Sequence, residues 1–145
     1  NEAKIAVMGV PDKPGIAAKI LTPLSDAAIS VDMIVQNVSN EGLTDFTFTV
    51  TKADLKQSLL ITNEVAREIH AKQVISDENI SKISIVGLGM RSHAGVATQM
   101  FTALSQNSIN IQMISTSEIK ISVVIDEKYT ELAVRVMHES FGLAS

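Results

Sequence analysis

The 145-residue chain is 46% hydrophobic, carries a formal net charge of −4, and contains one Tyr, four Phe and neither Trp nor Cys. The hydrophobic content predicts a packed core, built mostly from aliphatic side chains, and excludes a disordered tail. The acidic balance, with no run of Lys or Arg, argues against nucleic acid and anionic membranes as partners. The lack of cysteine excludes disulfides and thiolate zinc sites, and we expect a cytoplasmic protein.

The ends of the chain carry no targeting signal that the sequence reveals. No stretch reaches the roughly 18 to 20 apolar residues of a membrane-spanning helix, and the first residues do not resemble a signal peptide. The chain begins with Asn1 rather than Met. We therefore expect a cleaved product or an excised fragment of a longer protein.

The sequence repeats itself once. Residues 4–10, Lys-Ile-Ala-Val-Met-Gly-Val, recur at 82–88 as Lys-Ile-Ser-Ile-Val-Gly-Leu. After a two-residue insertion the same register continues and aligns Gly15 with Gly95 and, further on, Met33 with Met113. Such self-similarity predicts two copies of one small unit, and we place them at residues 1–79 and 80–145.

Hydrophobic periodicity gives the order of elements in the first copy. Alternation at Ile5 and Val7 indicates a strand, and the spacing of Ile16, Ile20 and Leu24 indicates a helix with Pro14 near its first turn. The remaining predicted elements are an antiparallel pair at 31–39 and 43–51, a helix at 53–71, a short strand at 73–75 and a polar connector at 76–79. The order β-α-β-β-α-β is ferredoxin-like.

The second copy repeats this order but stops early. Its predicted elements are a strand at 83–88, a helix at 94–107, strands at 110–118 and 119–126, and a helix from about 129 to 139. The last strand has no counterpart before Ser145. We therefore predict an α+β protein of two tandem ferredoxin-like (βαββαβ) domains, the second lacking its last strand, which residues upstream of Asn1 or a second chain would supply.

Several catalytic patterns are incomplete in this sequence. The Gly-Leu-Gly at 87–89 has Ser92 where a dinucleotide fingerprint needs its third glycine. His138 is followed by Glu, but Gly142 stands where a zinc-binding H-E-x-x-H motif needs its second His, so His70 and His138 are interpreted as helix-surface residues. Ser92 and His93 are adjacent, yet no acid is evidently placed to orient the imidazole.

The loop at residues 11–15 has the chemistry to bind a free amino acid. It precedes a predicted helix, whose exposed N–H groups around Gly15, Ile16 and Ala17 suit a carboxylate. Gly15 allows close approach to the backbone, and Asp12 can accept from an ammonium group. Spacing alone leaves open the alternative that this segment is only a well-capped turn.

Three segments resemble the tandem ACT domains of aspartokinases. They are Gly-Val-Pro-Asp-Lys-Pro-Gly at 9–15, Ile-Ser-Val-Asp-Met-Ile-Val-Gln-Asn at 29–37 with Thr-Asp-Phe at 44–46, and the run from 109 to 122. The resemblance covers nearly the whole chain but no kinase portion. It implies a regulatory module for threonine and lysine without catalytic residues, metal ion or cofactor of its own, ATP being used only by the parent kinase domain.

Motif matching also implies the residues that contact each effector, drawn from both copies. The threonine-type contacts would be Asp12, Gly15, Ile16, Ala17, Gln36, Asn110 and Ile111. The lysine-type contacts would be Asp32, Met90, Ser117 and Glu118. The second loop, which reads His-Ala-Gly at 93–95, lacks the acid and the prolines of the first. The two sites should therefore differ in ligand or strength.

The expected partners are a second copy of this chain, bound through the ACT domains, the aspartokinase catalytic domain or subunit, and a small-molecule amino acid. One alternative is the regulatory subunit of another biosynthetic enzyme, with a branched-chain effector. A second is an acylphosphatase-type hydrolase, which needs a phosphate-binding Arg in the first loop, whereas the only loop Arg is Arg91 in the second. A third, an RNA-binding sheet, is disfavoured because the strands lack stacking aromatics.

Overall fold

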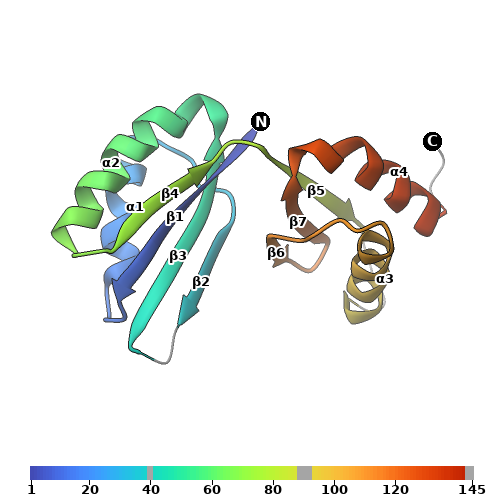
Figure 1. Cartoon of the computed structure of the whole chain (residues 1–145), viewed down its shortest axis with the longest axis horizontal. Helices are drawn as coiled ribbons and strands as arrows, with labels where there is room; N and C mark the ends of the chain where they lie inside the picture. The colour runs from blue at the N-terminus through green and yellow to red at the C-terminus, as the bar shows by residue number, and fades with distance from the viewer. Residues whose placement is uncertain (39–40, 88–92, 143–145) are drawn as a thin grey trace. The chain divides into compact units, whose positions relative to one another are not determined.

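The computed structural model describes residues 1–38, 41–87 and 93–142. The chain forms two compact units, Asn1–Glu78 and Asn79–Ser145, each with its own hydrophobic core (Figure 1). Each unit combines an antiparallel sheet with two helices. The α+β class predicted from the sequence is therefore confirmed.

The first unit has the complete β-α-β-β-α-β order. Its elements are β1 (Glu2–Pro11), α1 (Ile16–Asp26), β2 (Ile34–Val38), β3 (Leu43–Thr51), a 3-10 turn η1 (Lys52–Asp54), α2 (Leu55–Glu68) and β4 (Gln73–Asp77). The strands lie in the order β2-β3-β1-β4, and every neighbouring pair is antiparallel. This order places β1 in the interior of the sheet, paired with β4 as far as Met8 and with β3 as far as Pro11.

The core of the first unit lies between this sheet and its two helices. Alternate residues of β3, including Phe46 and Phe48, are almost fully buried, and their ring centroids lie 6.2 Å apart. Val7 and Ile5 of β1 stand opposite them in register, and Leu24 of α1 belongs to the same cluster. Each such buried side chain contributes about 1.5–3 kcal/mol relative to exposure, so the alternating pattern determines which face of the sheet the helices cover.

Helix boundaries in the first unit differ from the sequence prediction at two places. Gly15, with φ of 88°, forms the N-cap of α1, so Pro14 precedes the helix instead of occupying its first turn. The helix α2 ends at Glu68, and His70 follows in the left-handed region with φ of 60°. His70 is therefore exposed, as predicted, but it lies in the helix-terminating turn and not in the helix itself.

Strand β4 is longer than predicted. It continues to Asp77, and Ser76 and Asp77 pair with Ile5 and Lys4 of β1. These two polar residues were assigned to a connector because they break the apolar pattern. On an edge strand, however, backbone pairing requires no apolar side chain, so composition underestimates the length of the strand.

The second unit has the same order up to its second helix. It contains β5 (Ile80–Val86), α3 (His93–Gln106), β6 (Met113–Thr116), β7 (Lys120–Asp126), a 3-10 turn η2 (Glu127–Tyr129) and α4 (Thr130–Ser140). The sheet order is β5-β7-β6, again antiparallel. Its core contains Leu104 of α3, Val123 of β7 and Ala133 of α4.

The sequence repeat is also a repeat of backbone geometry. After α1, Ala28 has φ of 59°, and the Ile29 N–H donates to the Leu24 carbonyl at 3.0 Å. After α3, Ser108 has φ of 57°, and the Ile109 N–H donates to Leu104 at 3.0 Å. Both helices end in a left-handed residue, as many helices do, so the two copies share more than hydrophobic pattern.

One edge of the second sheet lacks the strand that its counterpart has. Within the described residues β5 pairs only with β7, whereas β1 pairs with both β3 and β4. A cavity of about 310 Å³ lies beside β5, lined by residues 83–86 of that strand, by Val134, Met137 and His138 of α4, and by Phe141 directly after the helix. His138 lies on α4 as predicted, is half-buried, and lines this cavity.

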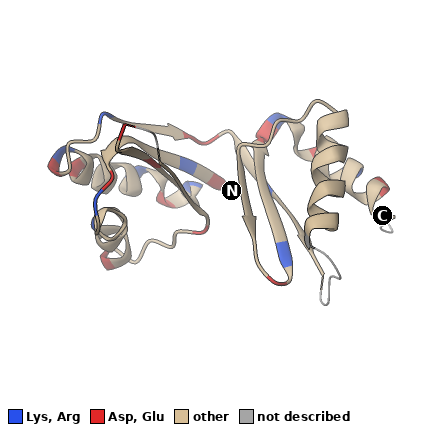
Figure 2. Cartoon of the chain, turned by 90° about the horizontal axis from the view of Figure 1, so that it is seen from below, with Lys and Arg blue, Asp and Glu red and all other residues tan. Residues whose placement is uncertain are grey.

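Among the described residues, Lys and Arg do not gather in one continuous stretch of the ribbon (Figure 2). Figure 2 shows acidic and basic residues interspersed along the described ribbon. In that part of the chain, no helix has the length and apolar character needed to span a membrane.

Candidate functional site

The first residues of the β1–α1 loop are hydrogen-bonded to the turn between β2 and β3. Pro11 pairs with Leu43, and the Asp12 N–H donates to the Gly42 carbonyl at 2.9 Å. The Asp12 side chain is exposed. These bonds hold the backbone at the start of the loop, while the carboxylate of Asp12 is accessible to a ligand.

The N-terminus of α1 lacks a side-chain cap. Its N-cap is Gly15, and the first turn contains no acidic residue. The Ile16 N–H donates to Lys13 at 3.3 Å, while Ala17 in the same turn is half-buried. A Cβ at Gly15 would meet no atom within 4 Å, so the space over the backbone is open. Open space beside uncapped N–H groups suits a ligand carboxylate.

Two predicted residues of the first unit lie away from this loop. Gln36 is exposed on the edge strand β2, opposite Phe46, and is two strand spacings, or roughly 10 Å, from β1. Asp32 precedes β2, and its N–H donates to the Thr49 carbonyl at 3.0 Å, near the far end of β3 from Asp12. The structure therefore groups Asp12, Gly15, Ile16 and Ala17 and separates both Gln36, of the threonine set, and Asp32, of the lysine set, from them.

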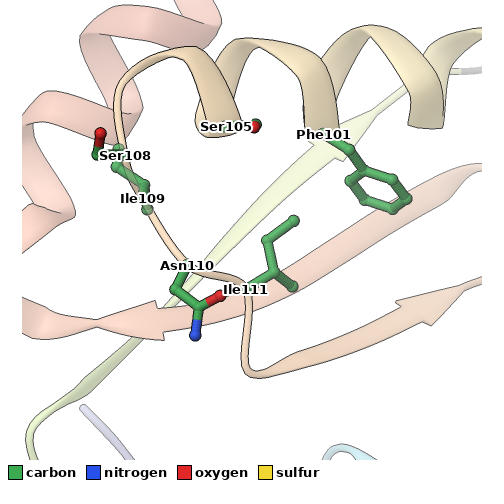
Figure 3. Close-up of a pocket in the computed structure, with 6 residues that line it drawn as sticks. All are labelled: Phe101, Ser105, Ser108, Ile109, Asn110 and Ile111. Atoms are coloured by element: carbon green, nitrogen blue, oxygen red, sulfur yellow. The ribbon is translucent and has the colours of Figure 1, made fainter.

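A cavity of about 500 Å³ lies under α3 in the second unit. Figure 3 shows residues of α3 above the loop that contains Asn110 and Ile111. The lining consists of Phe101, Ser105, Ser108, Ile109, Asn110 and Ile111. Sequence matching indicated only the last two. The sequence analysis missed the other four. Phe101 and Ser105 are four residues apart on the helix before the matched loop, so they lie on the same helix face, and this spacing could have indicated them.

The remaining lysine-type residues are only partly described. Ser117 and Glu118 are both exposed in the turn between β6 and β7, where the Ser117 N–H donates to the Lys120 carbonyl at 2.8 Å. Met90 lies outside the described residues. Asp32 belongs to the first unit and this turn to the second, so each proposed effector set takes residues from both units.

The described residues include no group of three or more His, Asp or Glu side chains that could hold a metal ion. The polar groups of the candidate residues are carboxylates, hydroxyls, two side-chain amides (Gln36 and Asn110) and backbone N–H groups. Such groups bind and orient a small zwitterion, and their arrangement presents no paired nucleophile and base among the described residues.

Family models of the ACT domain match both units, one at residues 4–70 and another at 83–141. The aspartokinase of Pseudomonas aeruginosa is 61% identical over 143 residues, which is 99% of this chain and 35% of that protein. The aspartokinase of Helicobacter pylori is 48% identical over the same share of each. The chain thus spans about a third of the length of the curated relatives it matches.

Two solved structures match over most of their own length. A chain from a crystal structure of aspartokinase alpha and beta subunits is 57% identical, with a TM-score of 0.92 and coverage of 99% of this chain and 94% of that one. The ligand-free regulatory subunit of aspartate kinase from Thermus thermophilus is 40% identical, with a TM-score of 0.91 and coverage of 97% and 93%. These matches lie on regulatory chains, so no catalytic activity is expected of this one.

Proposed function

Since this chain belongs to the aspartokinase family and comprises two regulatory ACT domains, we propose that it binds threonine, lysine or both as allosteric effectors. The observation that carries this proposal is the uncapped N-terminus of α1 beside Asp12, with open space over Gly15. A free amino acid has a carboxylate for the N–H groups and an ammonium for Asp12. In the cell, we expect the chain to act in the cytoplasm.

The second unit has a cavity of its own, which two residues of the threonine set line, Asn110 and Ile111. Its cavity of about 500 Å³ lies within the range of small-ligand pockets, roughly 300–1,000 Å³. Asn110 offers an amide and Ser105 a hydroxyl to a polar side chain, while Phe101 and Ile111 offer apolar surface. Threonine carries both a hydroxyl and a methyl group.

The proposed lysine site is more acidic than the proposed threonine site. Glu118 and Asp32 are exposed carboxylates, which suit the second ammonium group of lysine, and Ser117 adds a hydroxyl. Met90 completes the proposed set. The two sites are thus distinguished by charge: one carboxylate in the threonine set and two in the lysine set.

The alternative of a branched-chain effector has one observation in its favour. Phe101, Ile109 and Ile111 make much of the cavity lining apolar, which suits valine or leucine as well as the methyl group of threonine. Only binding distinguishes these ligands.

The proposed response passes through an assembly of two copies with a catalytic partner. Ile34 and Val38 are 49% and 63% exposed on the edge strand β2, so a second copy could extend the sheet there. A ligand that binds the assembled state better than the separated one stabilises assembly by mass action. The catalytic domain or subunit would then respond to the effector, and phosphorylation of aspartate with ATP would belong to that partner.

Calorimetric titration with threonine, lysine, valine, leucine and isoleucine tests the proposal. We expect saturable binding of threonine or lysine, and mass spectrometry of ligands released from the purified protein should identify the same compound. Binding of only the branched-chain amino acids would establish the alternative. No binding of any of the five, to a folded dimer, would overturn the effector function.

A further inference from the structure

Strand β1 contains one extra residue just before the effector loop. Val7 pairs with Phe46 and Val10 with Thr44, so Met8 and Gly9 together stand opposite the single residue Asp45. This two-against-one pairing is a β-bulge, and Gly9 adopts φ of 64° within it. The bulge leaves the Gly9 N–H outside the regular ladder.

The carboxylate of Asp45 takes the place of the missing ladder acceptor. The Gly9 N–H donates to Asp45 Oδ1 at 2.9 Å, across 36 residues of sequence, and the bond is partly buried. On the other side, the Lys72 N–H donates to the Met8 carbonyl at 2.9 Å. The stem of Lys72 also covers Gly9 so closely that a Cβ there would lie 2.6 Å from its carbons. The bulge is therefore held from both neighbouring segments.

The extra residue changes the side on which the loop residues project. Before the bulge, Ile5 and Val7 are the buried residues of β1, whereas after it the buried residue is Val10. Without the bulge, the same alternation would direct Pro11 to the helix side of the sheet and Asp12 to the other side. With the bulge, Asp12 follows the parity of Val10 and is directed to the side where α1 begins.

Among the residues described in the second unit, no corresponding bulge is found. There the Gly87 N–H donates to a backbone carbonyl, that of Ile119, at 2.8 Å. Ile85 pairs with Ile121 as Val7 pairs with Phe46, so Lys120 stands where Asp45 stands in the first unit. A lysine cannot accept a hydrogen bond from an N–H group. Among the described residues, the hydrogen bond from a bulge N–H to a carboxylate is therefore found in the unit that contains the Asp12 loop and not at the corresponding position of the other unit.

We propose that Asp45 is a positioning residue for effector binding, which acts by holding the Gly9 bulge and thereby directs Asp12 toward the N-terminus of α1. This inference rests on the proposed function. Asp45 acts through an acceptor oxygen and not through its charge, and this separates it from a residue that contacts the ligand ammonium.

Three variants test this role in the whole chain, with threonine as the probe. Asp45→Ala removes the acceptor, and we expect the Kd for threonine to rise about tenfold, equivalent to about 1.4 kcal/mol. Asp45→Asn removes the charge but keeps an oxygen, and its Kd should stay within about threefold of the original. The control is Thr51→Ala, which removes another side-chain acceptor for a backbone N–H, that of Asp54, at the far end of β3.

Amide hydrogen exchange provides a readout independent of ligand. Exchange at Gly9 should accelerate about tenfold in Asp45→Ala and remain slow in Asp45→Asn and Thr51→Ala, because only the first variant removes the acceptor of the Gly9 N–H. Equal threonine affinity in Asp45→Ala and the original chain, or equal losses in the Ala and Asn variants, would overturn the inference. If the original chain binds no threonine, the proposed threonine site fails, and unchanged exchange in Asp45→Ala would still overturn the role of Asp45.

Discussion

Asp12 and Glu118 are both exposed carboxylates, and the proposed sites assign them to different ligands. Asp12→Asn should weaken threonine binding by roughly one to two decades, since loss of a charge-assisted hydrogen bond costs about 1.5–3 kcal/mol. Glu118→Ala should weaken lysine binding in the same way. Each variant should bind the other ligand normally in calorimetric titration. Loss of both ligands in either variant would contradict two separate sites.

Two hydroxyl groups on α2 are buried without a hydrogen-bond partner among the described residues. Ser58 is 0% and Thr62 1% exposed, and neither side-chain oxygen has an acceptor or donor. Replacing Thr62 by the isosteric Val removes an unsatisfied polar group from the core. We expect Thr62→Val to stabilise the first unit by about 1 kcal/mol, measured by urea unfolding.

Thr49→Val is the matched control for this prediction. Thr49 is equally buried, but its Oγ1 accepts from the Met33 N–H at 3.0 Å. The same substitution there leaves a buried N–H unsatisfied and should destabilise the unit by about 1–3 kcal/mol. Opposite signs in the two variants would show that hydrogen bonding decides the effect. A loss of stability in Thr62→Val would mean that its hydroxyl has a partner in solution.

At the scale of elements, alanine substitutions at Gly9 and Gly42 separate two costs in stability. One cost comes from the positive φ of the backbone, and the other comes from atoms that surround the new Cβ. Both glycines have positive φ, 64° and 75°, but a Cβ would meet the Lys72 stem at Gly9 and no atom within 4 Å at Gly42. Gly42→Ala should therefore cost about 1 kcal/mol of unfolding free energy from the backbone alone. Gly9→Ala should cost about 1 kcal/mol more, because Lys72 must also move. Equal losses in denaturant unfolding would indicate that the lysine stem moves away freely.

At the scale of the whole molecule, we expect a dimer whose association tightens with effector. Each unit has only about 70 residues, and units of this size bury a limited fraction of their surface. The edge strand β2 also exposes Ile34 and Val38. Analytical ultracentrifugation should show a dimer that threonine stabilises, and Val38→Arg should shift the chain toward monomer. A chain that stays monomeric at saturating threonine would contradict this expectation.

The sequence by itself determined the fold class, the internal repeat and the order of the elements. Local pattern carries this information, because alternation at Ile5 and Val7 and helical spacing at Ile16 and Ile20 each place apolar side chains on one face. The polar groups of the loop around Asp12 and Gly15 could likewise be predicted from neighbouring residues in the sequence. Boundaries were less predictable, since polar strand ends such as Ser76 and Asp77 follow the partner strand and not their own composition.

Only the tertiary structure decided which distant residues meet. The cavity over Asn110 includes Phe101 because the left-handed turn at Ser108 folds the following loop back beneath α3. The Gly9 N–H in the bulge donates to Asp45, which is far away along the chain but opposite across the sheet. Pairing register is a relation between strands, and no single segment contains it. A one-residue shift in that register reverses the direction of every side chain after it, Asp12 included.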